Sequence, residues 1–376
     1  MKKLLSALLA AATVACNAGT APPAALPSMR NTSTLAEVDS HYRAVLLVSD
    51  GYIGTKAVDP NLQNVWGLVA SATSPWWIAN NGTGTSSLYD GQGRNSVGLP
   101  FINVPSEAGG PGSPTGIVFS GKGFVVSAKG KSGPARFIFA SEDGVISGWN
   151  PATDFRNAIA VAHGANRAAV YKGLAIATTP KGDRLFATDF SNATIDVFDD
   201  KFAWLHGTGF ADPEIPPGFA PFGIRTIGDL VYVTYAKQDT ARHDSVAGEG
   251  FGYVSAFDLS GNFVARIASG EKLNAPWGIA QAPASGFGRA SGKLLIGNFG
   301  DGHILALDQP KDGEQDEGQL LEDDQGEIVI DGLWGISFGF GNTNSGPTNS
   351  LYFAAGPRKE SHGLFGFVEP VAVTEE

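Results

Sequence analysis

The residues of this chain best suited to coordinate a metal ion are oxygen-bearing side chains at the ends of short apolar runs. Asn80 ends WWIAN, Asp189 ends LFATD, and Asn298 ends LLIGN, with Asp301 three residues further on. Amide and carboxylate oxygens of this kind suit Ca²⁺ or Mg²⁺. A fold that sets the ends of these runs side by side is predicted to gather all four around one cation. The alternative is that each side chain caps the turn after its own run.

Acid–base chemistry is conceivable at two histidines in segments without apolar periodicity. His243 stands in KQDTARHDS and His362 in KESHGLF. Because imidazole titrates at about pH 6.5, either could act as a general base. Tyr235 and Lys237 precede His243 closely and could supply the acid that a lyase needs. A structural role is the alternative for each histidine, and the chain has no GxSxG motif for a nucleophilic serine.

These candidates must be positioned by a unit that recurs six times. Each copy opens with a glycine that precedes Ile or Leu, and the glycines are Gly67, Gly116, Gly173, Gly223, Gly278 and Gly335. The second runs are Trp76–Asn80, Phe124–Ala128, Leu185–Asp189, Val231–Tyr235, Leu294–Asn298 and Leu351–Ala355. Short apolar runs separated by turn residues are strands, and a period of about 40 to 50 residues is the mark of a propeller blade. The repeats predict an all-β, six-bladed β-propeller of four-stranded antiparallel blades.

The ends of the chain predict how the ring closes. Residues 42–48 (YRAVLLV) form an unpaired strand pattern before the first copy, and the sixth copy ends after its third strand, at Val368. We expect the N-terminal strand to complete the last blade, which removes an exposed sheet edge. The predicted propeller spans residues 42–369, and residues 370–376 form a short tail.

Aromatic residues at the starts of the inner strands predict a ligand site at one end of the central channel. These residues are Trp66, Phe222, Trp277 and Trp334, and the loops after the second strands add Asn81 and Lys131. Aromatic walls with a few convergent polar groups are typical of small-molecule or sugar sites. The alternative is that the aromatic rings plug the channel.

The N-terminus predicts export. Lys2 and Lys3 precede a 12-residue apolar run, LLSALLAAATVA, which is too short for a resident membrane helix. Cys16, the only cysteine, follows this run, and residues 13–16 resemble the lipobox of bacterial lipoproteins apart from Thr13. We therefore expect a signal peptide over residues 1–16, lipidation of Cys16, a tether over residues 17–41, and a periplasmic or cell-surface location. Ordinary cleavage without lipidation is the alternative.

Charge and cysteine content exclude other classes of protein. The formal net charge is −11 and no basic cluster is present, so nucleic-acid binding is not expected. One cysteine cannot form a disulfide within the chain. We expect a monomer whose only attachment to a membrane is the lipid.

Several long motifs in order resemble one known family. Among them are LVSDGYIGTKAVDPNLQNVWGLVAS, FADPEIPPGFAPFGI and LYFAAGPRKESHGLFGF. Together the motifs resemble an uncharacterised family of exported bacterial six-bladed propellers, some of which carry a PEP-CTERM sorting tail. Residues 370–376 do not resemble that tail, so the resemblance does not lead us to expect this sorting route. The repeats are more loosely similar to NHL and strictosidine-synthase-like propellers. In lactonases of the latter type, Asp, Asn and Glu side chains hold a cation at the top of the channel.

Three functions are compatible with these observations. The first is a module without catalytic activity that binds a small molecule, a glycan or an envelope protein. The second is a hydrolase or lactonase dependent on Ca²⁺ or Mg²⁺, which requires the four metal candidates to converge. The third is a lyase, which requires His243 or His362 to face Tyr235 and Lys237. The first is preferred, with no cofactor assigned, because propellers host many unrelated activities.

Overall fold

The structure is a computed structural model that describes residues 40–95, 98–164, 167–206, 209–308 and 318–372. The predicted signal peptide, Cys16 and the tether up to residue 39 lie outside these ranges, as do residues 373–376. None of the helices in the described ranges has the length and apolar character needed to cross a membrane.

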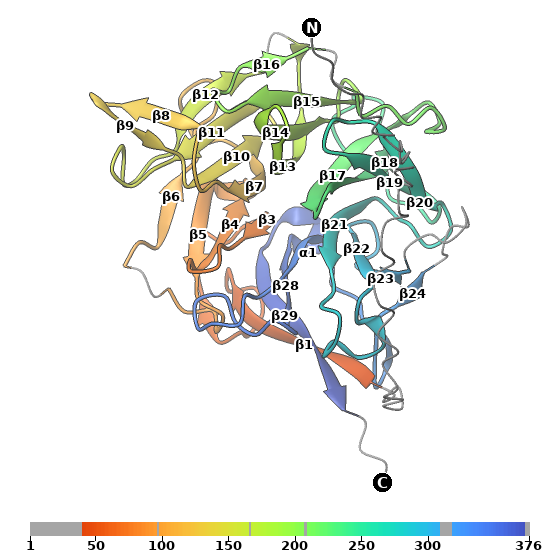
Figure 1. Cartoon of the computed structure of the whole chain (residues 1–376). Coiled ribbons are helices and arrows are strands. Elements are labelled where there is room, and N and C mark those ends of the chain that lie inside the picture. Colours follow the sequence, from red (N-terminus) through yellow and green to blue (C-terminus); the bar gives the residue numbers. More distant parts are fainter. Residues whose placement is uncertain (1–39, 96–97, 165–166, 207–208, 309–317, 373–376) are drawn as a thin grey trace, which may run out of the picture. The chain divides into compact units, whose positions relative to one another are not determined.

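The described residues form six antiparallel sheets arranged as a ring, which confirms the six-bladed β-propeller (Figure 1). Blade one is β3 (Val65–Val69), β4 (Trp76–Asn80), β5 (Thr85–Tyr89) and β6 (Phe101–Asn103). Blade two is β7 (Pro114–Phe119), β10 (Phe137–Ser141), β11 (Val145–Trp149) and β12 (Ile159–His163). Blade three is β13 (Tyr171–Thr179), β14 (Gly182–Asp189), β15 (Thr194–Asp199) and β16 (Trp204–Leu205).

The other three blades follow the same plan. Blade four is β17 (Phe219–Ile227), β18 (Leu230–Lys237), β19 (Gly252–Asp258) and β20 (Phe263–Ser269). Blade five is β21 (Pro276–Gln281), β22 (Leu294–Asn298), β23 (Ile304–Leu307) and β24 (Gln319–Leu320). Blade six is β27 (Leu333–Phe338), β28 (Leu351–Ala355), β29 (Leu364–Ala372) and β1 (Ser40–Ser49), with β2 (Ala57–Val58) added in parallel to β1.

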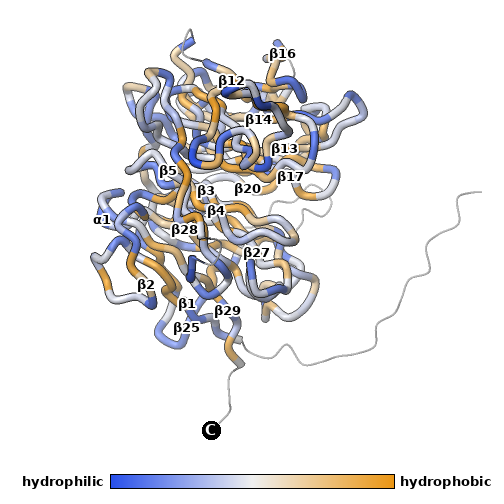
Figure 2. The backbone as a smooth tube through the Cα atoms, turned by 90° about the vertical axis from the view of Figure 1, so that its left-hand side faces the viewer, coloured by the Kyte–Doolittle hydropathy of each residue, from blue (hydrophilic) through white to orange (hydrophobic). Residues whose placement is uncertain are grey.

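Short elements occupy the connections between these strands. They are the hairpin of β8 (Val125–Ala128) and β9 (Lys131–Pro134), the pair β25 (Glu322–Asp323) and β26 (Gly326–Glu327), the 3₁₀ turns η1 (Asn81–Thr83) and η3 (Gly288–Ala290), and the helical turn α1 (Pro357–Glu360). Apolar residues are concentrated along the blade strands, as the hydropathy colouring shows (Figure 2). Between blades one and two, for example, Trp77 stacks on Phe137 with ring centroids 4.1 Å apart.

Strand β1 closes the ring as the sequence predicts. It runs antiparallel to β29, from Ser40 opposite Ala372 to Ser49 opposite Leu364. Leu47 and Val48 are fully buried, and the Tyr42 hydroxyl donates to the backbone oxygen of Phe287 at 3.0 Å. The N-terminal strand therefore completes the sixth blade and is also anchored to blade five.

One strand prediction is wrong. The run Phe124–Ala128 is not the second strand of blade two, because its residues Val125–Ala128 form β8, which pairs with β9 in a separate hairpin. The second strand is β10, which pairs with both β7 and β11. The loop after the second strand of this blade is therefore residues 142–144, and the hairpin is an insertion.

The six repeated glycines are required by the close approach of the inner strands. A Cβ atom placed on Gly223 would lie 2.0 Å from the Trp277 backbone oxygen, and one on Gly278 would lie 2.6 Å from that of Trp334. A Cβ atom placed on Gly335 would likewise lie 2.6 Å from the Trp66 backbone oxygen. Real Cβ atoms do not approach this closely, so the repeat pattern records where neighbouring blades touch around the channel.

We expect Gly223→Ala to destabilise the fold by about 3 kcal/mol, at the upper end of the range for overpacking, because the obstacle is backbone. Urea unfolding measures the change. Gly54→Ala is the matched control, since a Cβ on Gly54 would meet nothing within 4 Å. Equal stability of the two variants would contradict the proposed reason for the repeat.

Candidate functional site at the channel mouth

The loops between the second and third strands of all blades open at one end of the channel, which we call the channel mouth. Polar side chains from five blades lie there in one connected group. We call this group the mouth cluster; it consists of Asn64, Asn81, Glu142, Lys172, His243, Asp244 and Glu360.

Lys172 is the centre of the mouth cluster. Its side chain is 1% exposed, and its ammonium group donates to Glu142 of blade two and, at 3.3 Å, to Asp244 of blade four. The ammonium group also lies 5.0 Å from the centroid of the Trp66 ring. Burial of a charge is unfavourable unless it is paired, and here two carboxylates and an aromatic face surround it.

Amide side chains extend the cluster toward blades one and six. Asn81 donates to Glu142 Oε2 at 2.8 Å and accepts from Asn64 at 3.2 Å. Asn64 in turn accepts from the Trp66 indole at 3.1 Å. These bonds fix the orientation of both amides and leave one Glu142 oxygen for Lys172. At the other end, His243 Nδ1 lies 2.9 Å from Asp244 Oδ1.

Glu360 reaches the cluster from a strained turn. Arg358, Lys359 and Glu360 all have positive φ angles, of 55°, 57° and 63°. The left-handed region disfavours residues with a Cβ by roughly 1–2 kcal/mol each, and such residues normally occur there singly. Strain of this kind is concentrated at functional sites. Here it sets Glu360 beside Asn64 and near the charges of Glu142, Lys172 and Asp244.

The local charges shift two carboxyl groups in opposite directions. Burial, together with the charge of Glu142, raises the pKa of Glu360 above its ordinary value. Burial acts to raise the pKa of Asp244 too, but the charge of Lys172 and the bond from His243 outweigh it and lower that pKa. Two neighbouring carboxyl groups that titrate apart are typical of sites that bind or transfer protons.

The raised pKa of Glu360 predicts a pH dependence of stability. The folded protein binds this proton more tightly than the unfolded chain, so stability falls as the pH rises from below about 4.5 to above the folded pKa. Glu360→Gln cannot ionise, and its stability relative to wild type should increase across that window. Thermal unfolding between pH 4 and 8 measures this, with the exposed Glu249→Gln as a control for the loss of one charge. A constant difference between Glu360→Gln and wild type would contradict the assignment.

The predicted aromatic wall is a plug below the cluster. Trp66 stacks on Trp334 with centroids 3.4 Å apart, Phe222 and Trp277 contact Trp334 at 5.6 and 5.8 Å, and Phe299 stacks on its other side at 3.9 Å. Trp66, Trp334 and Phe222 are at most 2% exposed and Trp277 is 9% exposed. Direct ligand contact by these four rings stays a prediction, because in the structure Trp66 and Trp334 stack on each other and Phe222 and Trp277 pack against Trp334.

The four predicted metal ligands bond within their own blades. Asn80 donates to Thr85 and Ser87, and Asp189 accepts from Asn192. Asn298 accepts from the backbone nitrogen of Asn274 at 3.1 Å and donates to the backbone oxygen of Lys272 at 2.7 Å, whereas Asp301 pairs with His303. Asn80, Asp189 and Asn298 are fully buried at the ends of β4, β14 and β22. They hold the turns of separate blades, and coordination of one ion by all four stays a prediction.

Within the described part of the chain, a different set could hold a metal ion. One ligand atom each of Glu142, His243 and Asp244 lies within 4.8 Å of the others. All three belong to the mouth cluster. The ammonium group of Lys172 pairs with both carboxylates, and a cation there would compete with it.

The structure does not bring the remaining predicted catalytic candidates to one place. Tyr235 is buried among the apolar residues between blades three and four, and burial raises the pKa of its hydroxyl. The ammonium group of Lys237 lies over the Phe251 ring, at 3.9 Å from its centroid. His362 pairs with Asp50 at 2.8 Å and stacks on Tyr52 near β1. Of this set, His243 is the member that lies in the mouth cluster.

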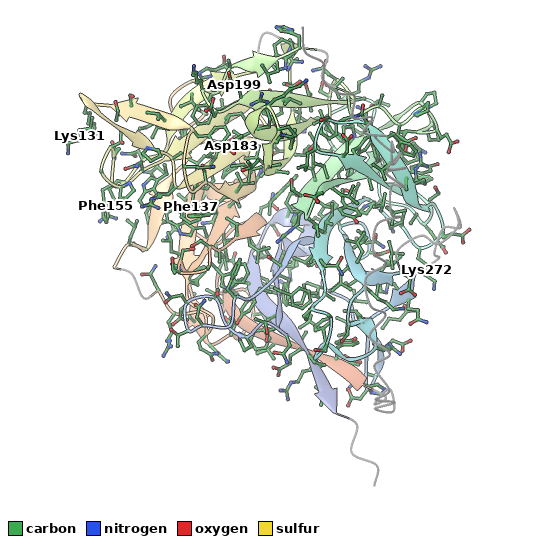
Figure 3. The ribbon with its side chains drawn as sticks, viewed as in Figure 1. Lys131, Phe137, Phe155, Asp183, Asp199 and Lys272 are labelled. Atoms are coloured by element: carbon green, nitrogen blue, oxygen red, sulfur yellow. The ribbon has the colours of Figure 1, made fainter. Side chains whose placement is uncertain are left out.

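Lys131 lies on the β8–β9 hairpin, away from the centre of the ring (Figure 3). The notion that it faces the channel depended on the wrong strand assignment in blade two. The loop that does face the mouth carries Glu142, which the sequence pattern did not reveal for the same reason. Asp244 and Glu360 were missed because each stands in an irregular loop whose conformation no periodicity reveals. The sequence predicted only their neighbours: His243 directly precedes Asp244, and His362 stands two residues after Glu360.

Comparison with known proteins identifies relatives. No family model matches the chain. The chain is 34% identical over 332 residues to "Uncharacterized protein R648" of Acanthamoeba polyphaga mimivirus, covering 86% of this chain and 78% of that protein. It is 33% identical over 328 residues to "Uncharacterized protein L690" of the same virus, with 85% and 83% covered.

Among solved structures, a glucose dehydrogenase is similar with a TM-score of 0.50 at 14% identity, covering 88% of this chain and all of that one. Identity this low supports the propeller fold alone. The two viral relatives match over most of this chain and most of their own length. The chain therefore belongs to the same protein family as R648 and L690.

Proposed function

We propose that this protein is a binding module that holds a hydroxyl-rich small molecule, such as a sugar, at the mouth cluster. The observation that carries the proposal is the buried, doubly paired Lys172 beneath a rim of accessible acceptors. Asp244 is 68% exposed and His243 is 47% exposed, whereas Lys172 is 1% exposed. Polar groups that are already held in place orient a ligand and lower the entropy cost of binding it.

The excess of hydrogen-bond acceptors over donors at the mouth cluster favours a ligand rich in hydroxyl groups. Three carboxylates, Glu142, Asp244 and Glu360, surround a single ammonium group, so acceptors exceed donors at the rim. A ligand that offers several O–H groups would satisfy them. A ligand with an ammonium group would also do so, but its binding would weaken as salt screens the charges. Strain in residues 358–360 further supports a functional role for this rim.

A thermal-shift screen tests the proposal, with a panel of neutral mono- and oligosaccharides in one arm and spermidine in the other. A ligand that binds the folded state raises the melting temperature, and the rise grows with the logarithm of the ligand concentration once that concentration exceeds the Kd. We expect a saccharide to stabilise the wild type and not Glu142→Gln, while Arg156→Met, an exposed substitution in blade two, keeps the response. Stabilisation by spermidine alone, lost at 0.5 M salt, would replace the sugar by an amine. No response in either arm would reject the site.

A divalent-cation-dependent hydrolase is the second candidate, favoured by the Glu142, His243 and Asp244 group. Carboxylate and imidazole ligands together suit Mn²⁺ or Zn²⁺ better than Ca²⁺. Titration with Ca²⁺, Mg²⁺, Mn²⁺ and Zn²⁺ should then give a stabilisation that His243→Ala abolishes. If His243→Ala is still stabilised by the metal, the metal binds at a site other than the Glu142, His243 and Asp244 group.

The proposal places the module outside the cytoplasm. Lys2, Lys3, the apolar run and Cys16 support this, although they lie outside the described residues. Lipidation predicts that the wild type partitions with membranes and that Cys16→Ser is found in the soluble exported fraction. If both proteins partition equally, Cys16 is not lipidated, and export with ordinary signal-peptide cleavage is the explanation that stays.

A further inference from the structure

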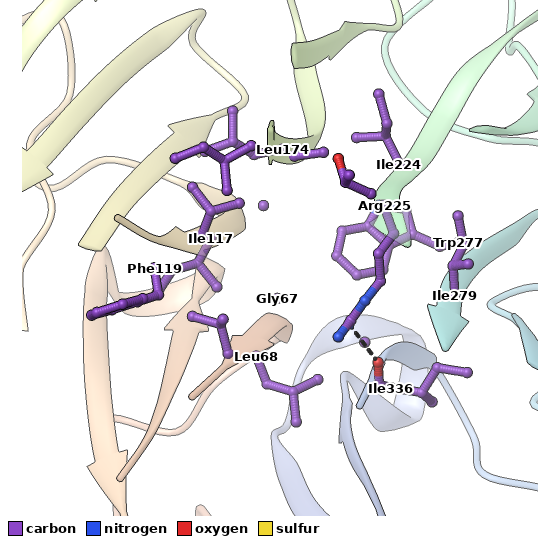
Figure 4. Close-up of a pocket in the computed structure, with 17 residues that line it drawn as sticks. Gly67, Leu68, Ile117, Phe119, Leu174, Ile224, Arg225, Trp277, Ile279 and Ile336 are labelled. Atoms are coloured by element: carbon purple, nitrogen blue, oxygen red, sulfur yellow. Dashed lines mark hydrogen bonds between the residues drawn. The ribbon is translucent and has the colours of Figure 1, made fainter. Parts of the chain in front are cut away.

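A cavity lies in the channel on the side of the aromatic plug away from the mouth cluster. Its walls come from the inner strands of all six blades, at residues that follow the repeated glycines, and its volume is about 190 Å³. Trp277 lines it, so the plug separates it from the mouth cluster. The side chains that surround it are mostly aliphatic, among them Leu68, Ile117, Leu174 and Ile336, with Phe119 and Thr226 beside them (Figure 4).

Arg225 is the charged exception among these lining residues. From β17 it reaches across the channel to blade six, where it donates to the Ile336 backbone oxygen at 3.2 Å (Figure 4). It also donates to Ser337 Oγ at 3.0 Å. Among the described residues, no carboxylate lies within ion-pair distance of it. Burial lowers the pKa of the guanidinium group, but an arginine does not lose its proton in proteins.

A largely aliphatic cavity that contains a guanidinium group without a carboxylate partner favours a ligand with a negative charge and an apolar body. Arg225 is half-buried, and withdrawal of a charge from water without a counter-ion is unfavourable. A guanidinium group has five N–H donors, of which Ile336 and Ser337 engage two, so a carboxylate could bind in the bidentate mode that arginine favours. Besides Arg225, the lining side chains offer the hydroxyl of Thr226 as a donor, which is fewer donors than the four oxygens of inorganic phosphate require. The cavity volume of about 190 Å³ is large enough for a benzene ring, because a cavity of about 150 Å³ is known to bind benzene.

We propose that this cavity binds a small apolar monocarboxylate, of about the size of benzoate or hexanoate, with its carboxylate on Arg225 and its hydrocarbon against the aliphatic walls. The site is distinct from the mouth cluster, and the inference does not depend on the function proposed for the mouth. The repeated glycines permit it, because they bring six inner strands close enough to form one continuous wall.

The alternative role for Arg225 is mechanical. Its two bonds to blade six brace the ring across the channel, and a brace needs no ligand. Arg225→Met removes both the charge and the brace, whereas Arg225→Lys keeps the charge and loses the bidentate geometry. The mechanical role predicts lower stability for both variants and no dependence on added carboxylates.

Binding of 4-fluorobenzoate, followed by ¹⁹F NMR, tests the proposal on the full chain, with 4-fluorobenzyl alcohol as the neutral analogue. We expect saturable binding of the acid, at least tenfold weaker binding of the alcohol, and loss of acid binding in Arg225→Met. Arg156→Met is the matched control and should bind as wild type does. Saturating hexanoate should raise the wild-type melting temperature by about 2–5 °C.

Three results would overturn the proposal. They are equal binding of acid and alcohol, retention of acid binding in Arg225→Met, and stabilisation by inorganic phosphate or sulfate but not by the carboxylates. If Arg225→Met does not fold, Arg225→Lys decides: acid binding as tight as that of wild type would contradict bidentate recognition, and at least a tenfold loss would support it. A saccharide response at the mouth is unaffected by any of these outcomes.

Discussion

Deletion of residues 40–49 should abolish cooperative folding. Strand β1 covers the whole edge of β29, and Tyr42, Leu47 and Val48 are at most 1% exposed. Burial of these three side chains contributes roughly 5–9 kcal/mol, which is comparable with the total stability of about 5–15 kcal/mol of a folded protein. The deletion also leaves the β29 edge unpaired, and an unpaired edge promotes aggregation.

Circular dichroism melts and size-exclusion chromatography measure this effect. The deleted chain should lack a sharp thermal transition and elute as aggregate. The control is a chain without residues 17–39, which retains every strand described above and should melt as the full chain does. A sharp transition in the 40–49 deletion, within a few degrees of the control, would contradict closure of the ring by β1.

Lys172→Met should destabilise the protein by about 2–4 kcal/mol. Removal of one partner from a buried ion pair is strongly unfavourable, because the other charges lose their compensation. Most of this loss comes from Glu142, because its side chain is 15% exposed and would lose its partner away from water. Asp244 contributes less, because it is 68% exposed and stays solvated without Lys172. Methionine keeps the length and apolar character of the lysine stem, so the loss reports the ammonium group.

A double-mutant cycle with Glu142→Gln checks the origin of this loss. Neutralisation of Glu142 in the Lys172→Met background should recover part of the stability, so that the two changes are not additive. Urea unfolding of the wild type, both single variants and the double variant supplies the four values. Strict additivity would show that the pair contributes nothing and that Lys172 acts through packing alone.

The ring was predictable because its signal is steric and local. Gly67, Gly223 and Gly278 recur where neighbouring backbones meet, and the six glycines appear in the sequence at nearly constant intervals. Closure by residues 42–48 followed from an unpaired strand pattern at one end and a missing strand at the other. The glycine pattern is visible within each repeat, and the closure is visible from the two ends of the chain taken together.

The site was predictable only in part. Asn81 and His243 were named, and both lie in the mouth cluster. Glu142 was missed because the β8–β9 insertion has the apolar pattern of a blade strand and displaced the assignment of β10. Glu360 depends on a left-handed turn of three residues, which residue types alone do not specify.

The aromatic residues illustrate a further limit. The sequence placed Trp66, Trp277 and Trp334 correctly at the starts of inner strands, but residue type does not tell whether a ring faces a ligand or another ring. Their mutual contacts, at centroid distances of 3.4 to 6.2 Å, are a property of the closed ring. The same holds for Arg225, whose lack of a carboxylate partner in the described residues emerges only when six strands from distant parts of the sequence meet.

Hydrogen exchange at the channel mouth tests the proposed binding function most directly. Wild-type protein is compared with and without the saccharide that stabilises it most, and amide exchange is followed by mass spectrometry. Binding at the mouth cluster predicts slower exchange confined to peptides that contain the loops 81–84, 142–144, 238–246 and 356–363, and no change in Glu142→Gln. Protection confined to the inner-strand peptides around Arg225, or to the outer edges of the blades, would contradict the assignment of the site to the mouth.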